Sequence, residues 1–317
     1  MMPRSDPSTT KSRAILRFAP SPTGALHLGT ALSALLTYDA AHRLGGRFLL
    51  RIENIDLGRC RREHEQALLE DLAWLGLAWD RPVRRQSEHF DTYRNGLAAL
   101  NRQGLLYACT CTRSGIAGVV ADHEQTGTRW PHDPDGALLY PGTCRPGRPA
   151  PLDLDAVMGK GAALRLDMDR ALAAADQEIV WREHGDALFE DRTGPPIGSL
   201  PAPRTVVATP ARWGDVVLAR KDTPTSYHLS VVMDDALQGI THVTRGMDLF
   251  EATAIHRLLQ ILLGLPEPLY AHHRLLIGKD GRKLSKSRGD SGLKALRDAG
   301  NTPVDIRRRL GLPPARQ

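Results

Sequence analysis

Short apolar runs alternate with helical repeats along the first hundred residues, and this alternation is the strongest constraint on the fold. The runs at 14–18 and 48–52 are expected to be buried strands, each followed by a helical repeat. Helices are expected over residues 29–44, 63–77 and 87–103. Strands and helices that alternate at these lengths predict a parallel α/β sheet with crossover helices.

The pattern changes near residue 107 and returns after residue 210. Residues 112–151 are rich in Gly, Pro, Asp and Arg without sustained periodicity, and strands of a smaller subdomain are expected at 163–168 and 179–182. The alternation then resumes with strands at 216–220, 240–244 and 275–278 and helices at 226–237 and 249–263. The predicted organisation is a split catalytic domain (13–106 and 211–290), an inserted subdomain (107–210) and a short C-terminal helical segment (291–317).

Composition narrows the class of protein. Hydrophobic residues make up 41% and charged residues 25% of the 317 residues, which is a globular composition. No apolar run reaches the roughly 18–20 residues that span a bilayer, and residues 1–12 lack the apolar core of a secretory signal. We therefore expect a soluble cytoplasmic protein with reduced cysteines and no membrane partner. The net charge of +6 permits a polyanionic partner.

The first segment with chemical character runs from Arg17 to Thr30. A strand ends there in a proline-stiffened loop, and a helix begins near Gly29. The free N–H groups of a helix start favour phosphate, His27 can donate a hydrogen bond to it, and Gly29 lets a planar base approach. The spacing fits neither the GxGxxG nor the Walker A loop. The alternative is a turn with a surface histidine.

The second segment is a cluster of lysines in a chain that otherwise uses arginine. Three of its seven lysines, Lys279, Lys283 and Lys286, fall within eight residues. Two of them flank Ser285 in a polar loop, where they could bind charge that develops during phosphoryl or nucleotidyl transfer. The alternative is a solvated basic loop.

Together these segments resemble the HxGH and KMSKS motifs of class I aminoacyl-tRNA synthetases, in the right order. Residues 17–24, 51–56 and 231–248 resemble the glutamyl/glutaminyl branch. Thr30 stands where the generic motif has its second histidine, and Leu284 replaces the methionine of KMSKS. The chain ends thirty residues after Ser287, so the resemblance is best to a truncated paralogue family, the glutamyl-Q tRNA(Asp) synthetases.

This resemblance implies a Rossmann-like sheet and an ATP-dependent ligase. Such an enzyme activates L-glutamate with ATP and Mg²⁺, then attaches it to the queuosine base in the anticodon of tRNA(Asp); we expect a monomer. Three alternatives stay open: a shortened glutamyl-tRNA synthetase that charges a tRNA 3′ end, a small-molecule nucleotidylyltransferase, and an inactive tRNA-binding paralogue. The basic clusters 61–62, 84–85 and 307–309 could contact tRNA phosphates or could be solvated helix faces.

The resemblance also implies roles for individual residues. The catalytic residues would be His27, Lys283 and Lys286, and the ATP contacts would come from His27, Gly29 and Lys286. Arg17 and Arg245 would hold the two carboxylates of glutamate, with either arginine open to either carboxylate. Glu53 would hold the ammonium group, and Tyr227 would hydrogen-bond the substrate. The remaining residues expected to line the glutamate pocket are Phe18, Ala19, Pro20 and Ser21. Asp234 and Asp235 lie in the same motifs and could serve the structure instead.

The cysteines indicate a structural zinc site. Cys109, Cys111 and Cys144 bracket a loop-rich segment without its own apolar core, and three thiolates there suit tetrahedral zinc. The resemblance implies Tyr140 as the fourth ligand, while His123 and His132 remain alternatives of the more usual type. Free buried cysteines are the other interpretation, and Cys60 lies outside the cluster.

Overall fold

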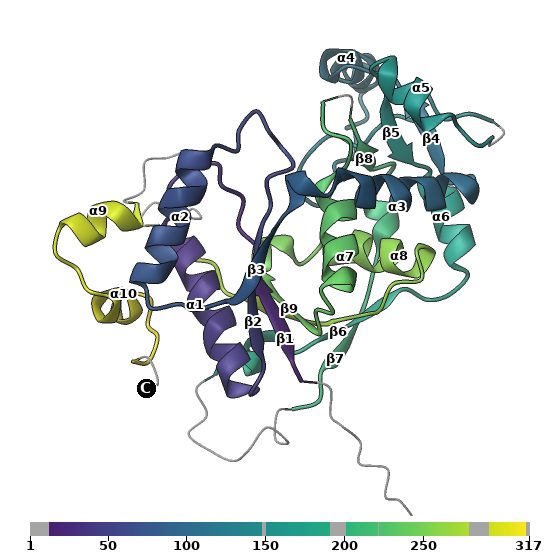
Figure 1. The fold of residues 1–317 in the computed structure, drawn as a ribbon. Helices are drawn as coiled ribbons and strands as arrows, with labels where there is room; N and C mark the ends of the chain where they lie inside the picture. The colour runs from purple at the N-terminus through teal and green to yellow at the C-terminus, as the bar shows by residue number, and fades with distance from the viewer. Residues whose placement is uncertain (1–12, 148–149, 191–200, 221, 279–291, 315–317) are drawn as a thin grey trace, which may run out of the picture.

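The computed structural model describes residues 13–147, 150–190, 201–220, 222–278 and 292–314. The centre of the described structure is a seven-stranded sheet, whose surroundings are drawn in Figure 1. The strand order is β3-β2-β1-β9-β10-β6-β7. All neighbours pair in parallel except β6 and β7, which are antiparallel. The predicted parallel α/β sheet is therefore confirmed. The strands are β1 (Ile15–Phe18), β2 (Arg47–Ile52), β3 (Asp80–Arg85), β6 (Val180–Glu183), β7 (Arg204–Val207), β9 (His242–Gly246) and β10 (Leu269–His273).

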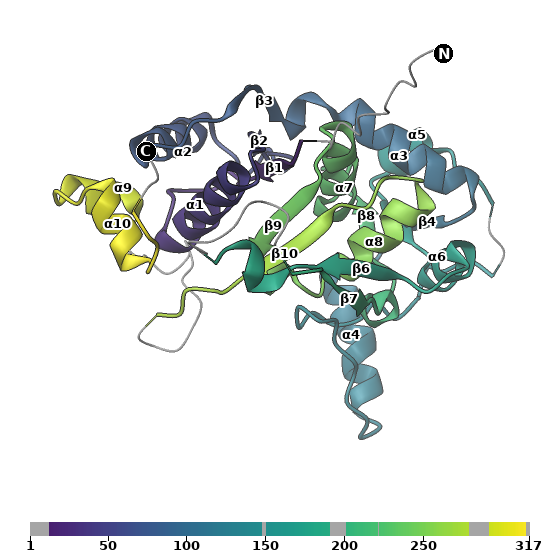
Figure 2. The same cartoon turned by 90° about the horizontal axis from the view of Figure 1, so that it is seen from below.

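Helices cover both faces of this sheet (Figure 2). On one face, α1 (Leu28–Arg43) and α2 (Arg62–Trp74) share a core with the C-terminal α9 (Leu293–Asp298) and α10 (Pro303–Arg309). On the other face lie α3 (Phe90–Arg102), α7 (Tyr227–Leu237) and α8 (Thr253–Leu262). Because side chains alternate along a strand, Leu16 and Phe18 of β1 join the first core, and Arg17 points to the other face.

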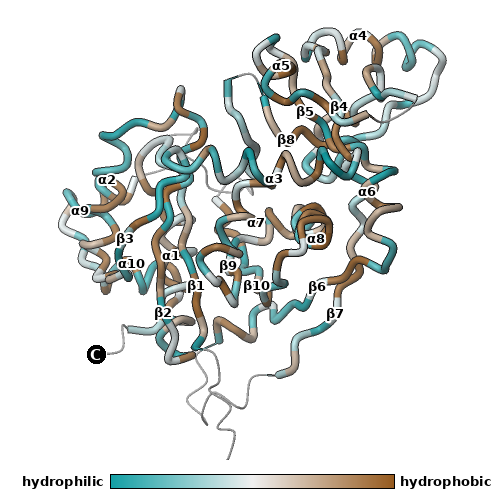
Figure 3. Tube along the Cα trace, turned by 45° about the vertical axis from the view of Figure 1, so that its right-hand side comes forward, coloured by the Kyte–Doolittle hydropathy of each residue, from teal (hydrophilic) through white to brown (hydrophobic). Residues whose placement is uncertain are grey.

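A second, three-stranded antiparallel sheet packs against the α3–α7–α8 face. It consists of β4 (Leu106–Cys109), β5 (Ala163–Leu166) and β8 (Val217–Ala219) in the order β4-β5-β8. Three helices accompany it: α4 (Arg113–Glu124), α5 (Leu154–Gly159) and α6 (Met168–Ala175). Its apolar residues continue the core of the main domain, where hydrophobic residues gather along α8 (Figure 3).

The structure corrects the expected membership of two strands. The strand expected at 179–182 in the small subdomain is β6 of the main sheet, where Glu183 pairs with Tyr270 of β10. Conversely, the strand expected at 216–220 in the main domain is β8 of the small sheet. Periodicity identifies a strand but not its partner, because pairing depends on distant residues. The segment at 107–210 therefore contributes to both sheets.

Several elements differ from their expected positions for local reasons. The edge strand β3 was not expected, because its sequence DRPVRR is charged and contains a proline, features tolerated at a sheet edge. Helix α4 contains two glycines and buries only Val120, so it lacks an apolar stripe. The strand expected at 275–278 lies instead at Leu269–His273. Short 3-10 turns complete the described chain: η1 (Gln86–Glu88), η2 (Gly185–Leu188), η4 (Pro210–Trp213) and η5 (Met247–Leu249).

Among the described residues, no helix combines the length and the apolar character needed to cross a bilayer.

Candidate active site and metal centre

Three adjoining cavities lie at the carboxyl ends of the parallel strands, where α/β sheets place ligands. A central cavity of about 480 Å³ is lined by all of the residues expected to bind glutamate: Arg17, Phe18, Ala19, Pro20, Ser21, Glu53, Tyr227 and Arg245. A helix-start cavity of about 190 Å³, which includes His27 and Gly29, shares Thr30, Ser33, Gly246 and Asp248 with it. A loop cavity of about 450 Å³ shares Ser21, Thr23, Glu53 and Tyr227 with it.

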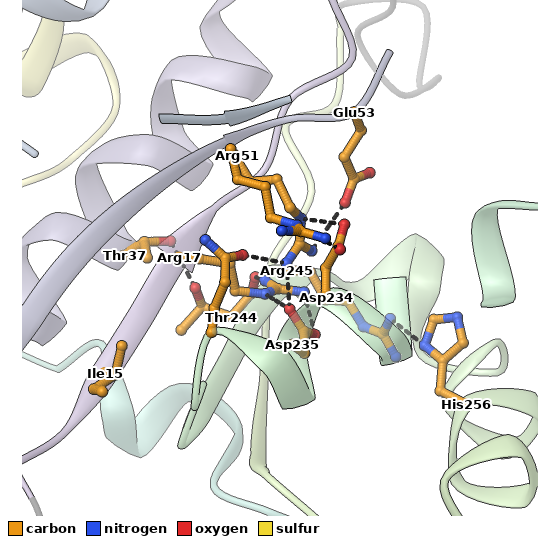
Figure 4. A network of polar contacts seen from close by, with 12 residues as sticks. Ile15, Arg17, Thr37, Arg51, Glu53, Asp234, Asp235, Thr244, Arg245 and His256 are labelled. Atoms are coloured by element: carbon orange, nitrogen blue, oxygen red, sulfur yellow. Dashed lines mark hydrogen bonds and ion pairs between the residues drawn. The ribbon is translucent and has the colours of Figure 1, made fainter. Parts of the chain in front are cut away.

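Arg17 and Glu53, which line the central cavity, belong to a buried charge network (Figure 4). This network is called the floor below. Arg17 of β1 donates from Nε to Asp235 Oδ1 at 2.9 Å and from Nη2 to Oδ2 at 3.2 Å. Arg51 of β2 donates from Nη1 to Asp235 Oδ1 at 2.7 Å and from Nη2 to Glu53 Oε1 at 3.1 Å. Arg84 of β3 donates to Asp234 Oδ1 at 2.7 Å. Three arginines from neighbouring strands thus converge on two aspartates of α7.

The network determines which carboxylates of the floor ionise readily. Burial opposes ionisation of Asp235, but the guanidinium groups of Arg17 and Arg51 outweigh it and lower the pKa of Asp235. Burial raises the pKa of Glu53, against the opposing influence of Arg51. The alternative that Asp234 and Asp235 serve the structure agrees with this geometry. Arg51 had no expected role, although its alternation with Leu50 and Ile52 on β2 signals that it points away from their core.

Arg245 of β9 has a different environment. It is 5% exposed and donates from Nε to His272 Nε2 at 3.0 Å, from Nη1 to His256 Nδ1 at 2.9 Å and from Nη2 to Thr253 Oγ1 at 2.5 Å. Burial lowers the pKa of His272 to about 4 and that of His256 well below its usual value, so both rings are neutral. Within the described chain, no carboxylate forms an ion pair with Arg245. Its charge is therefore available to an anion in the central cavity.

His27 is the N-cap of α1, so part of the row of N–H groups expected to be free for phosphate is occupied by its side chain. Its Nδ1 accepts hydrogen bonds from the backbone N–H groups of Gly29 at 3.1 Å and Thr30 at 3.3 Å, and its Nε2 lies 3.1 Å from Thr30 Oγ1. A Cβ at Gly29 would lie 3.0 Å from the imidazole ring, so a side chain there would press against His27. The imidazole, rather than an open row of N–H groups, therefore faces the helix-start cavity.

Part of the expected site cannot be placed. Lys279, Lys283 and Lys286 lie outside the described residues. Two of the basic clusters considered for tRNA contact are partly used within the fold: Arg84 pairs with Asp234, and the buried Arg307 pairs with Asp39.

Three thiols and one phenol converge at the start of the insertion. The Sγ atoms of Cys109, Cys111 and Cys144 lie within 4.8 Å of one another. The Tyr140 hydroxyl lies 3.4 Å from the Sγ atoms of both Cys109 and Cys111 and accepts a hydrogen bond from the Cys144 N–H at 2.8 Å. This donor set of soft sulfurs with one oxygen fits a tetrahedral zinc ion.

The histidines considered as fourth ligands have other contacts. The ring of His123 packs edge-on against Trp130, and Nδ1 of His132 lies 3.0 Å from the Trp130 carbonyl oxygen. No histidine belongs to the metal-ligating group found among the described residues. Arg165 lies over the Tyr140 ring at 3.8 Å from its centroid, a cation–π contact that favours this position of the ring.

Comparison with known proteins finds a matching family and close relatives for this chain. The profile of the tRNA synthetases class I (E and Q), catalytic domain, matches residues 14–140 and 203–316. A glutamyl-Q tRNA(Asp) synthetase of Rhodobacter capsulatus is 49% identical over 94% of this chain and 100% of its own length. One from Symbiobacterium thermophilum is 37% identical, covering 92% and 83%. A glutamate–tRNA ligase of Aquifex aeolicus is 36% identical, covering 92% of this chain and 55% of its own.

Solved structures agree with this result. The glutamate tRNA ligase of Elizabethkingia meningosepticum, crystallised with its amino acid, has a TM-score of 0.65 and 27% identity, covering 88% of this chain and 53% of that one. The family match gives no support to a small-molecule nucleotidylyltransferase. The chain therefore belongs to the class I glutamyl- and glutaminyl-tRNA synthetase family and, within it, to the glutamyl-Q tRNA(Asp) synthetases.

Proposed function

We propose that this protein activates L-glutamate with ATP and transfers it to the queuosine base in the anticodon of tRNA(Asp). The observation that carries the proposal is the central cavity, where Arg245 has only neutral hydrogen-bond partners among the described residues and Glu53 lies on the same wall. The high identity to glutamyl-Q tRNA(Asp) synthetases over nearly the whole chain supports the choice of acceptor.

The pairing of the charged groups around the central cavity favours glutamate as the ligand. Arg17, Arg51, Arg84 and Arg245 are the arginines of the floor and wall, and their carboxylate neighbours are Glu53, Asp234 and Asp235. Of these four arginines, Arg245 is the one without a carboxylate partner among the described residues, so its charge is available to a carboxylate of the ligand. Because Asp235 already occupies the Arg17 fork, we assign the glutamate side-chain carboxylate to Arg245, whose fixed planar charge suits a carboxylate. Glu53 would accept the ammonium group.

Activation joins the glutamate α-carboxylate to the α-phosphorus of ATP and expels pyrophosphate. Both reactants are anions, so the protein must align them and neutralise their charge. His27, at the start of α1, would contact the triphosphate from the helix-start cavity, which adjoins the central one. Lys283 and Lys286 are assigned, by resemblance alone, to neutralise the negative charge of the same triphosphate. Mg²⁺ would accompany ATP and neutralise part of its phosphate charge.

Transfer requires that the acceptor reach the activated carboxyl group of glutamate by a route that the nucleotide does not occupy. A hydroxyl of the queuosine cyclopentenediol would attack the carbonyl carbon, and AMP would leave. The loop cavity shares Glu53 and Tyr227 with the central cavity and has no lining residue in common with the helix-start cavity, so we assign the acceptor to it. The nucleotide and the acceptor would then occupy separate cavities that both adjoin the glutamate.

We further propose that zinc is held by Cys109, Cys111, Cys144 and Tyr140. The ion would tie the end of β4 to the loop around Cys144, a segment with few buried apolar residues. Its role is structural, because the set offers no open coordination position.

Glutamate-dependent ATP–pyrophosphate exchange without RNA is the first test, and we expect activity. Labelled glutamate should then appear on tRNA(Asp) that carries queuosine and not on the same tRNA without it. Charging of unmodified tRNA(Glu) instead would show that the protein is a shortened glutamyl-tRNA synthetase. Sedimentation would test whether it is a monomer.

A further inference from the structure

The side chains that accept hydrogen bonds from Arg245 are held in place by further contacts. One of them, His272, is oriented by a carboxylate. His272 of β10 accepts from Arg245 through Nε2, which requires that its other nitrogen carry the proton. That nitrogen, Nδ1, lies 2.8 Å from Glu183 Oε2. Glu183 therefore selects the His272 tautomer that can accept from Arg245.

Glu183 is a fully bonded buried carboxylate. It is 2% exposed, and its Oε1 accepts from the backbone N–H groups of His272 at 3.0 Å and Gly185 at 2.9 Å. Its Oε2 accepts from Trp181 Nε1 at 3.2 Å as well as from His272 Nδ1. Burial opposes its ionisation, but the hydrogen bonds from His272 and the backbone lower the pKa of Glu183 to about 2. The group is therefore a fixed anion one imidazole away from Arg245.

A second histidine chain holds the other side of the guanidinium. His256 Nδ1 accepts from Arg245, and its Nε2 lies 3.2 Å from His228 Nδ1, so the Nε2–H can be donated to that ring. Burial lowers the pKa of His228 to about 4, which keeps this ring neutral as well. Arg245 thus has an oriented acceptor on Nε, Nη1 and Nη2.

The two arginines that line the central cavity therefore differ in their hydrogen-bond partners. Arg17 contacts a carboxylate directly, with Asp235 occupying two of its nitrogens. Arg245 is linked to the fixed anion Glu183 through the imidazole of His272. A carboxylate ligand that binds Arg245 therefore meets a guanidinium that is already oriented but has no direct counterion in the described part of the chain.

We propose that Glu183 is a positioning residue that acts through His272, orienting Arg245 for the side-chain carboxylate of the substrate while leaving that guanidinium without a direct counterion. This inference rests on the proposed function, because it assumes that Arg245 binds glutamate. It assigns a role in substrate recognition to β6, one of the two strands that the inserted segment contributes to the main sheet.

Glu183→Gln is the direct test, with the Michaelis constants for glutamate and ATP measured separately in pyrophosphate exchange. An amide at this position presents N–H where Trp181, Gly185 or His272 already donates. We expect the KM for glutamate to rise roughly 10- to 100-fold, the range for losing one hydrogen bond to a charged group. The KM for ATP should change by less than about twofold, since no contact to the helix-start cavity is removed.

A second variant distinguishes loss of the positioning contact from a general folding defect. His272→Asn can keep a donor toward Glu183 but has no atom at the Nε2 position that accepts from Arg245, so it should raise the KM for glutamate to a similar degree. Glu267→Gln is the matched control: this carboxylate bonds Arg257 and the Arg182 N–H and does not contact Arg245. It should leave both constants unchanged.

The outcomes distinguish failure of the proposed function from failure of the positioning role of Glu183. If wild-type protein shows no glutamate-dependent exchange, the proposed function fails. If wild-type protein is active but Glu183→Gln and His272→Asn keep a normal KM for glutamate, or raise both constants equally, the positioning role is wrong and the function stands.

Discussion

Substitution of Asp235 is the most direct test of how much the buried charge network contributes to the free energy of unfolding. Its Oδ1 accepts from Arg17 at 2.9 Å and from Arg51 at 2.7 Å, and its Oδ2 accepts from Arg17 at 3.2 Å. In Asp235→Asn the oxygen can keep two of these bonds, but the amide nitrogen then faces an N–H of Arg17. The substitution also leaves two buried guanidinium groups without this counter-charge.

Breaking a buried ion pair by removing one partner costs about 3–5 kcal/mol, and we expect Asp235→Asn to lower the free energy of unfolding by about that amount. The pH dependence has a definite sign. Because the folded pKa of Asp235 is lowered, its contribution is present above the unfolded pKa of about 3.9 and is lost as the pH falls through the folded value. The difference between wild type and variant should therefore be constant near pH 7 and shrink below about pH 4.

Urea unfolding followed by circular dichroism, at pH 7 and at several values below pH 4.5, measures both effects. Asp80→Asn is the matched control, because Asp80 pairs with Arg47 at 2.5 Å on the surface, with side chains 42% and 44% exposed. It should cost less than about 1 kcal/mol. If Asp235→Asn costs no more than this control, the buried pairing does not carry the stability assigned to it.

Three further predictions follow from the same geometry. Arg245→Lys should raise the KM for glutamate in pyrophosphate exchange by at least about tenfold, since an ammonium group cannot replace a planar donor fork; an unchanged KM would contradict the assignment of Arg245 to the substrate carboxylate. Cys144→Ser should reduce the zinc content of the purified protein, measured by atomic emission, whereas full zinc occupancy would exclude Cys144 as a ligand; Cys60→Ser is the control. Leu258→Ala should lower the free energy of unfolding by about 2–5 kcal/mol in urea, because Leu258 is fully buried, and a loss below about 1 kcal/mol would show that the core collapses around the site.

Much of the site could be predicted from the sequence because its motifs lie at strand ends. Arg17, Glu53 and Arg245 follow apolar strand segments, so a parallel sheet brings them to one edge, and the three line one cavity. The spacing of Cys109, Cys111 and Cys144 likewise indicated a metal site, and the structure adds the position of Tyr140. The assigned roles of these residues stay predictions, as do those of Lys283 and Lys286, which lie outside the described residues.

The sequence by itself determined the type and order of most helices and strands and the motifs that relate the chain to its family. Those features depend on residues within a few positions of one another, where periodicity and propensity act. Only the tertiary structure decided that Arg17 is paired with Asp235, 218 positions away, and that β6 enters the main sheet to place Glu183 behind His272. Such pairings depend on which distant segments share a face, and local sequence carries no record of that choice.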